Sequence, residues 1–327
     1  MLDAGGRILS ARFANMGHDR ITFATDSSIG LYFVTSQRVV YVKTLKQDSP
    51  LAKPTIRCLS INPELGTVVV GLDVVDAPVG GGTSLQNKFI IWPSGNFPKE
   101  EPLQLNIPVE RSPVGPRLPT CAILSKTQGP QMMLGRLFDG KVISFRLAKS
   151  RTKLKTESEL ASGAGLIASS DDGNWIAVVM TENGVKGVKV FSYVSESGTR
   201  LDPATIFWCK NRDPSCMAIQ EKVLNNNRVA HLALAEPAPE GQPPLPIEIL
   251  AVGLRGDFWT VYRLRIPSPC LSLSYCLGSA THLLSGHTDG MVALCDLQEG
   301  KTHQRRGSPN ATFLDISSDR ALVCAVE

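Results

Sequence analysis

Two clusters of basic residues have the side-chain chemistry of a phosphate-binding surface. The first cluster consists of Lys149, Arg151, Lys153 and Lys155. The second consists of Lys301, His303, Arg305 and Arg306. Each falls in a polar stretch that we interpret as an exposed loop, where lysine and arginine can neutralise the phosphates of an RNA backbone. The alternative for each cluster is a solvated loop without a ligand. Aromatic residues make up only 6% of the chain, so a platform for stacking RNA bases is not expected.

Two aspartates have the setting of structural turn residues. Asp139 and Asp289 each precede a glycine between two apolar runs. An aspartate in this position closes a tight turn by accepting a hydrogen bond from a backbone N–H group. We expect this structural role rather than a catalytic one, and we interpret Asp171 and Asp172 in the same way.

Catalytic, cofactor and metal chemistry have little support in the sequence. The chain lacks the motifs of the α/β-hydrolases, the zinc peptidases and the P-loop nucleotidases. The glycine-rich run 80–84 has no phosphate-binding lysine, so it predicts a flexible loop. Cys270, Cys276, His282 and His287 are spaced loosely like zinc ligands, but extended strands would spread them apart. We therefore expect no catalytic residue, cofactor, metal or small-molecule substrate.

The composition is that of a globular protein with a mildly basic surface. Of the 327 residues, 43% are apolar and 20% are charged, and the net charge is +4. This charge allows RNA contact without requiring it. No apolar run approaches the ~18 to 20 residues of a membrane helix, and the N-terminus has no apolar signal core. The eight cysteines form no C-x-x-C pair and most lie in apolar runs, so we expect reduced thiols in the cytosol or nucleus.

The apolar runs recur in groups, roughly every 35 to 50 residues. Each group holds about three β-rich runs separated by turns, and the last run ends near an aromatic residue. The expected units are 20–45, 56–92, 120–147, 166–194, 216–264 and 270–297. This period is typical of a propeller, in which each unit forms one sheet. We predict an all-β propeller of about seven blades.

The last expected blade is incomplete, because only two apolar runs follow Thr312. Residues 7–13 are a candidate for a closing strand. We predict a single propeller over residues 1–327, with insertions near 73–87 and 236–246. Because its last blade is incomplete, we expect either that the chain is a piece of a longer protein or that another chain completes the ring. We interpret residues 149–160 as a loop between blades, with a short charged helix as the alternative.

The sixth unit resembles a WD repeat. Its first matching run is Leu283–Gly286, the Asp289-Gly290 turn follows, and Val292–Leu294 completes the pattern. Trp92 stands where the family has its tryptophan. The other units are degenerate, and the Gly-His pair that opens a typical repeat is mostly absent. The resemblance implies a WD40-like β-propeller.

The order of the units is also similar to the N-terminal propeller of the WD-repeat subunit of the U3 snoRNA-associated t-UTP (UtpA) subcomplex of the small-subunit processome. Three stretches carry this similarity, over roughly a third of the chain. They are Gly5-Gly6 through Val39–Leu45, Met217–Ile219 with Leu250–Gly253, and Leu271–Ser274 through Gly286 to Leu297. The second propeller and the helical tail of that family have no counterpart in this chain.

This resemblance implies a non-enzymatic scaffold in ribosome biogenesis. Such a subunit binds the 5′ external spacer of pre-rRNA, helps to recruit the U3 particle, and supports rRNA transcription and 18S rRNA maturation in the nucleolus. Its implied partners are the protein subunits of a large complex and, through the basic loops, pre-rRNA or U3 snoRNA, with no membrane involved.

Two other functions remain open. One is a generic WD-repeat adaptor in another nuclear or cytoplasmic assembly, such as a chromatin, ubiquitin-ligase or transport complex. The insertions Ala77–Ser84 and Pro237–Pro246 would then provide its specificity. The other is an enzyme on a propeller scaffold, which needs converging carboxylates or histidines, and the chain has only five histidines.

Overall fold

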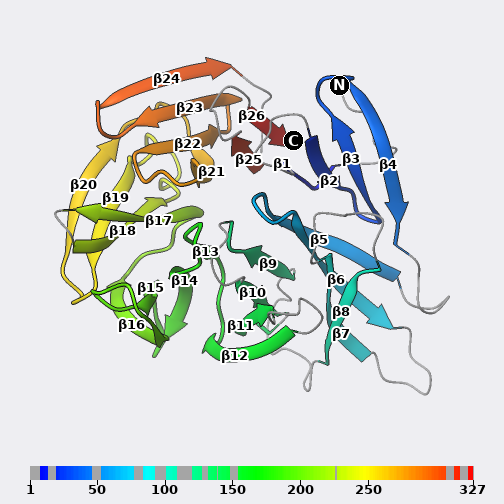
Figure 1. Ribbon diagram of the computed structural model, residues 1–327. Coiled ribbons are helices and arrows are strands. Elements are labelled where there is room, and N and C mark those ends of the chain that lie inside the picture. Colours follow the sequence, from blue (N-terminus) through cyan, green and yellow to red (C-terminus); the bar gives the residue numbers. More distant parts are fainter. Residues whose placement is uncertain are drawn as a thin grey trace. The chain divides into compact units, whose positions relative to one another are not determined.

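The protein is built from short meandering β-sheets. The computed structural model describes residues 8–13, 20–45, 53–76, 84–92, 101–108, 120–126, 132–137, 139–147, 154–224, 227–306, 313–316 and 323–326. In this part of the chain all helix and strand assignments are β-strands. Within each sheet, neighbouring strands are antiparallel and follow one another in chain order (Figure 1). The chain divides into two compact units, 1–163 and 164–327.

The first unit contains three four-stranded sheets. The first sheet consists of β1 (Ser10–Phe13), β2 (Arg20–Ala24), β3 (Ser28–Phe33) and β4 (Arg38–Thr44). The second consists of β5 (Lys53–Asn62), β6 (Thr67–Asp76), β7 (Ser84–Trp92) and β8 (Leu103–Pro108). The third consists of β9 (Cys121–Leu124), β10 (Met132–Arg136), β11 (Val142–Leu147) and β12 (Leu154–Ala161).

The second unit contains three further four-stranded sheets and one strand pair. The fourth sheet consists of β13 (Ile167–Ser169), β14 (Trp175–Glu182), β15 (Val185–Val194) and β16 (Arg200–Lys210). The fifth consists of β17 (Cys216–Leu224), β18 (Asn227–Ala235), β19 (Ile247–Gly253) and β20 (Phe258–Leu264). The sixth consists of β21 (Cys270–Tyr275), β22 (His282–His287), β23 (Met291–Asp296) and β24 (Lys301–Arg306). The strand pair consists of β25 (Phe313–Ile316) and β26 (Val323–Val326).

In the fifth blade the middle strands are buried, mostly on both faces, whereas the fourth strand is largely exposed. All seven residues of β19 are buried, and its sequence is almost continuously apolar. Its neighbour β20 begins with three exposed residues. A strand that is packed on both faces has an almost continuously apolar sequence, whereas an edge strand does not need one. The fourth strands β20 and β24 therefore carry exposed side chains.

The described part of the chain forms six four-stranded blades, so the prediction of about seven was wrong. The expected seventh unit supplies only the two strands β25 and β26 among the described residues. The strand that was expected to close this last unit lies elsewhere: β1 pairs with β2, with Ser10 opposite Ala24, and so completes the first blade.

Two further predictions need correction. Residues 154–161 are neither a loop nor a helix, because β12 pairs with β11 as the outer strand of the third blade. The insertion near 73–87 is shorter than expected, because β6 and β7 stay paired as far as Asp76 and Ser84. Its remaining residues, 77–83, lie outside the described part of the chain.

Candidate nucleic-acid interface

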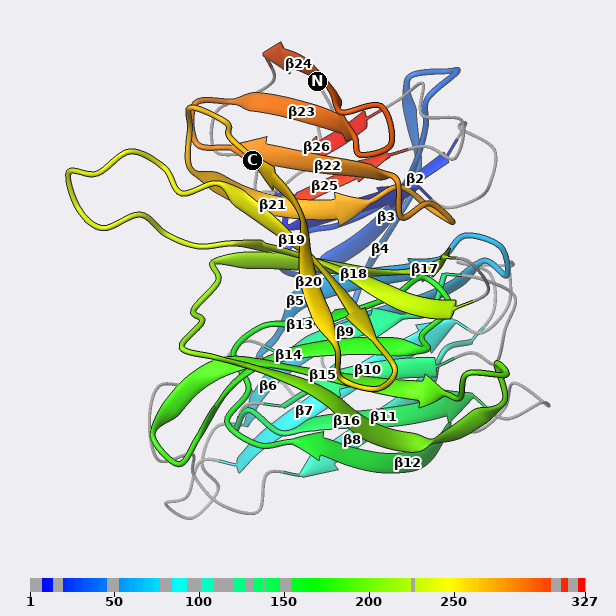
Figure 2. The same cartoon turned by 90° about the vertical axis from the view of Figure 1, so that its left-hand side faces the viewer.

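The second basic cluster lies on a strand rather than in a loop. Lys301, His303, Arg305 and Arg306 belong to β24, and all six residues of this strand are exposed. β24 pairs only with β23 in its sheet, and it forms the outer edge of the sixth blade (Figure 2). Basic residues on an edge strand disfavour pairing with a strand from another molecule. They also leave the charges accessible to a solvent-borne anion.

The alternation of the strand divides the cations between two faces. Lys301, His303 and Arg305 share one face, and Arg306 lies on the other, since successive side chains of a strand point to opposite sides. All residues of the paired strand β23 are buried or half-buried. Its half-buried Val292 lies opposite Arg305. One face of β24 therefore presents a row of basic side chains, beside apolar Val292 and Leu294 and, opposite Lys301, the carboxylate of Asp296.

The two arginines are the most available cations of this strand. Lys301 Nζ lies 2.8 Å from Glu299 Oε2 in an exposed ion pair, which partly neutralises it. Neither Arg305 nor Arg306 forms an ion pair within the described residues. Arginine keeps its charge at all physiological pH values and donates two parallel hydrogen bonds to a phosphate. Arg305 and Arg306 are therefore the best-placed phosphate ligands of the cluster.

The first basic cluster is described in part only. Lys149, Arg151 and Lys153 lie outside the described residues. Lys155 is in β12, opposite Arg146 of β11. The two clusters belong to different compact units. Lys301, Arg305 and Arg306 are the members of the predicted set that one strand brings together.

The predicted turn aspartates accept backbone hydrogen bonds. Asp139 Oδ1 accepts from the N–H of Lys141 and Asp289 Oδ1 from the N–H of Met291, each at 3.0 Å. The N–H of Met291 holds the pKa of Asp289 below its ordinary value. The glycine after each aspartate has a φ of 79°, a left-handed conformation that a side chain would strain. Both aspartates shape turns between the second and third strands of their blades.

Three of the four residues with loose zinc-like spacing have separate side-chain partners. The thiol of Cys270 lies 3.6 Å from that of Cys216, on the neighbouring blade. His282 Nε2 lies 3.5 Å from Asp296, and His287 Nε2 is 2.9 Å from the Ser285 hydroxyl. Across the described chain, no three His, Cys, Asp or Glu side chains gather as metal ligands would.

Comparisons with known proteins concern the fold. No protein-family model matches the chain, and no curated protein matches it. The β-propeller domain of Myceliophteria thermophila Cps50 (Swd1) matches with a TM-score of 0.58 and 11% identity, over 98% of this chain and 92% of that one. The chain has a WD40 β-propeller fold.

Two further solved structures match with similar scores. A chain of the mitotic checkpoint complex has a TM-score of 0.58 and 15% identity, over 99% of this chain and 89% of that chain. The WD40 repeats of RRP9 have a TM-score of 0.55 and 12% identity, over 99% and 88%. Identities in this range establish the fold of the propeller and nothing further about its partners.

The propeller also exposes aromatic side chains that sequence reasoning did not assign to a surface. Phe258 is 55% exposed and Trp259 is 43% exposed, at the start of the outer strand β20. Phe258 packs against Phe207 of β16, with ring centroids 4.5 Å apart. Exposed aromatic residues are enriched at protein interfaces. The signal in the sequence was the position of Phe258-Trp259 at the last run of a unit, which is the exposed strand of a blade.

The proline-rich insertion lies beside the same blade. Residues 236–246 connect β18 to β19 and project beyond both strands (Figure 2). Leu245 in this loop is 41% exposed.

Among the described residues, no helix is long and apolar enough to span a membrane.

Proposed function

We propose that this protein is a non-enzymatic scaffold of the small-subunit processome that contacts the rRNA precursor through β24. The observation that carries the proposal is the exposure of all six β24 residues, with Arg305 and Arg306 outside any ion pair among the described residues. Phosphate contacts of this kind position a protein on RNA without reading its sequence. Sequence specificity would then come from protein partners in the same assembly.

Several features support a scaffold over an enzyme. The fold is a WD40 propeller, and its exposed cationic and aromatic side chains lie on outer strands, where partners can reach them. The resemblance of the unit order to the UtpA subunit supports a role in rRNA transcription and 18S rRNA maturation. The expected location is the nucleolus of the nucleus, with pre-rRNA or U3 snoRNA as the nucleic-acid partner.

Affinity purification from cells tests this proposal. The tagged protein is recovered with its partners, proteins are identified by mass spectrometry, and co-purified RNA is sequenced. We expect the other UtpA subunits together with RNA from the 5′ external spacer. Recovery of an unrelated complex without any rRNA precursor would contradict the ribosome-biogenesis role and leave only the fold.

A second candidate function is a WD-repeat adaptor in another nuclear or cytoplasmic complex. The observations that favour it are the exposed aromatic pair Phe258 and Trp259 at one end of the fifth blade and the projecting loop 236–246 at the other end. Deleting Pro237–Pro246 and joining the ends with a short glycine linker should leave the melting temperature nearly unchanged, because the loop is mostly exposed. The adaptor function predicts that this deletion removes a protein partner, and unchanged co-purification would argue against it.

A further inference from the structure

Two cysteines of the first compact unit bring their thiols together across two blades. Cys58 lies on β5, the first strand of the second blade, and Cys121 begins β9, the first strand of the third. The Sγ atom of Cys58 accepts a hydrogen bond from the backbone N–H of Ala122 at 3.0 Å. The thiol of Cys58 also forms a hydrogen bond with the sulfur of Cys121. The two sulfur atoms are therefore neighbours, although the strands β6 to β8 lie between them in the chain.

The arrangement of β5 beside β9 fixes this contact. Ser60 lies two residues after Cys58, on the same face of β5, and its hydroxyl accepts the backbone N–H of Leu124 at 2.9 Å. Hydrogen bonds at Ala122 and Leu124 therefore set the register of the two strands. Gly71 of β6 lies opposite Cys58, and a Cβ at this glycine would be 2.6 Å from the Cys58 sulfur. Glycine at this position thus leaves the space that the sulfur occupies.

The surroundings of Cys121 favour its thiolate form. Arg136 on β10 lies directly opposite Cys121 in the antiparallel register. The hydrogen bond from Cys58, with the charges of Arg136 and Arg12, lowers the pKa of Cys121 to about 7 against the opposing effect of burial. Cys121 is also partly exposed. Reactive cysteines have this combination of nearby cations and partial exposure.

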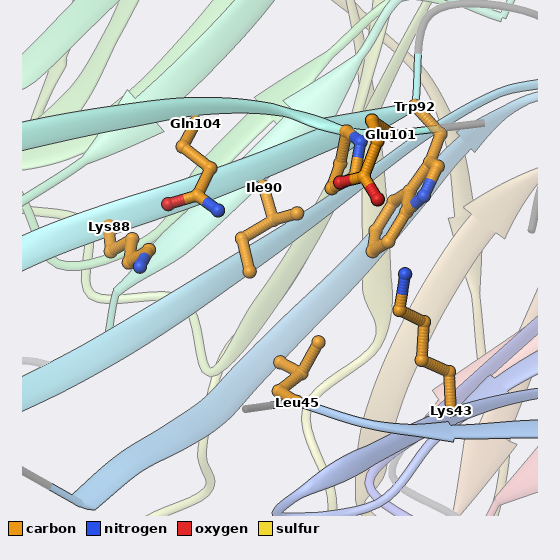
Figure 3. A pocket seen from close by; sticks show the side chains of 8 residues that line it. Lys43, Leu45, Lys88, Ile90, Trp92, Glu101 and Gln104 are labelled. Carbon is orange, nitrogen blue, oxygen red and sulfur yellow. The ribbon is translucent and has the colours of Figure 1, made fainter. Parts of the chain in front are cut away.

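The thiols are separate from the pocket of the same compact unit. That pocket, of about 270 Å³, lies between β4 of the first blade and β7 and β8 of the second, and Figure 3 shows Lys43, Ile90 and Trp92 around it. None of its lining residues is a cysteine. Access to Cys121 comes instead from its place on β9, an edge strand of its sheet. Such partial access suits an oxidant as small as hydrogen peroxide.

A second pair of thiols has the same placement in the other compact unit. Cys216 on β17 and Cys270 on β21 belong to the first strands of the fifth and sixth blades, and their sulfur atoms are 3.6 Å apart. The hydrogen bond with Cys216 and burial raise the pKa of Cys270 far above its ordinary value. This pair shares the contact between blades, whereas its Cys270 thiol is held in the protonated form. It is therefore a matched comparison within the same molecule.

We propose that Cys58 and Cys121 are a reversible oxidation site, at which hydrogen peroxide joins the second and third blades by a disulfide before the second thiol pair reacts. The Cys121 thiolate attacks one oxygen of the peroxide, the O–O bond breaks, and hydroxide leaves, so that Cys121 becomes a sulfenic acid. The sulfur of Cys58 then attacks the Cys121 sulfur, the S–OH bond breaks, and the hydroxyl leaves as water with the Cys58 proton. Two thiols and one peroxide thus give one disulfide and two waters, with two electrons passing from sulfur to oxygen.

Peptide mapping of the full chain after treatment with hydrogen peroxide tests the proposal. Iodoacetamide blocks the remaining thiols, and trypsin then gives the peptides 58–88 and 118–126, each with a single cysteine. We expect these two peptides to be linked, at a mass two hydrogen atoms below their sum, and to separate again in dithiothreitol. Recovery of both peptides with blocked thiols only would overturn the proposal, as would Cys121 oxidised to a sulfinic acid without a link to Cys58.

The second thiol pair tests the order of reaction. About half of a thiol with a pKa of about 7 is thiolate at pH 7, against about 3% of an ordinary thiol. The link between Cys216 and Cys270 should therefore form about tenfold more slowly, or slower still, at pH 7. If this link formed first, contact between blades would be sufficient for oxidation, and the proposal would be overturned.

Serine variants assign the roles of the two sulfur atoms. Cys58→Ser keeps a hydroxyl beside Cys121 but removes the second sulfur, so peroxide should leave Cys121 as a sulfenic acid that dimedone labels. Cys121→Ser removes the thiolate, so Cys58 should stay unlabelled, and circular dichroism checks the fold of both variants. Equal labelling of the two variants, or none in Cys58→Ser, would overturn the proposal. The RNA contact proposed for β24 lies in the other compact unit, so the two proposals fail or succeed separately.

Discussion

The carboxylate of Asp171 accepts a hydrogen bond of 2.8 Å from the backbone nitrogen of Gly278, a residue 107 positions further along the chain. Asp171 follows β13 in the fourth blade, and Gly278 lies between β21 and β22 of the sixth. The backbone nitrogen of Asp171 also donates to Gln220 on β17 of the fifth blade, at 3.0 Å. One buried aspartate therefore ties together three successive blades of the second unit.

Replacing Asp171 with alanine should destabilise the second unit. The variant removes the hydrogen bond that the buried Asp171 carboxylate accepts from exposed Gly278, and a typical hydrogen bond contributes about 0.5 to 1.5 kcal/mol to stability. Urea denaturation measures the loss as a lower free energy of unfolding. Asp202→Ala is the control, because Asp202 is exposed, and it should change stability by less than about 0.5 kcal/mol. Equal effects of the two substitutions would show that the link between blades is not stabilising.

A matched pair of glycines tests the packing within the fourth blade. A Cβ on Gly187 would lie 2.5 Å from the backbone oxygen of Cys209, on the neighbouring strand β16. Gly187→Ala should therefore cost about 1 to 3 kcal/mol of stability, because the backbone must move. A Cβ on Gly165 would meet nothing closer than 3.9 Å, so Gly165→Ala should be neutral within about 0.5 kcal/mol. Thermal melts of the two variants give the comparison, and a stable Gly187→Ala variant would contradict the close approach of β15 to β16.

Acid should destabilise the chain through His231. Burial, followed by the charge of Lys222, lowers the pKa of this ring from 6.5 to about 4 in the folded state. The unfolded chain therefore binds the proton first, and stability falls as the pH drops from about 6.5 to about 4. The His231 contribution should be about 2 kcal/mol near pH 5. His231→Leu should remove this part of the pH dependence in urea titrations, whereas His303→Leu on exposed β24 should retain it.

One thiol should react with alkylating agents near neutral pH. The hydrogen bond from Cys58, with the charges of Arg136 and Arg12, lowers the pKa of Cys121 to about 7 against the opposing effect of burial. The hydrogen bond with Cys216 and burial raise the pKa of Cys270 far above its ordinary value. Iodoacetamide labelling, followed by mass spectrometry, should rise with a midpoint near pH 7 at Cys121 and stay low at Cys270. A midpoint at the ordinary thiol value of about 8.5 would contradict the role of Cys58.

The sequence was sufficient to predict the inner strands and the apolar outer strands β4 and β20, but not the polar outer strands β12 and β24. The runs around Val68–Leu72 and Ile249–Gly253 are apolar because both faces of those strands are buried. The outer strands β12 and β24 have polar, charged sequences, so apolar periodicity is absent and only their pairing with β11 and β23 makes them strands. That is why the basic residues of β24 were interpreted as a loop.

The sites depend on contacts that sequence spacing does not encode. The link from Asp171 to Gly278 joins two turns in different blades, and the thiol pair of Cys58 and Cys121 joins β5 to β9. Residue type indicated a turn role for both Asp171 and Asp172. Asp172 has it, because its Oδ1 accepts the N–H of Asn174 at 2.9 Å, whereas the Asp171 carboxylate bonds to another blade. Asp139 and Asp289 needed only local geometry, and their turns follow from the Asp-Gly pairs themselves.

The central claim is that Arg305 and Arg306 contact the phosphates of an rRNA precursor, and the salt dependence of RNA binding tests it most directly. The purified chain is titrated with RNA from the 5′ external spacer over a range of KCl concentrations. The plot of log affinity against log salt should become less steep by about 0.7 for each phosphate that the Arg305→Glu/Arg306→Glu variant no longer neutralises. A Lys210→Glu/Arg265→Glu variant makes the same charge change at other exposed positions and should keep the original slope. Identical slopes for all three proteins would contradict the claim.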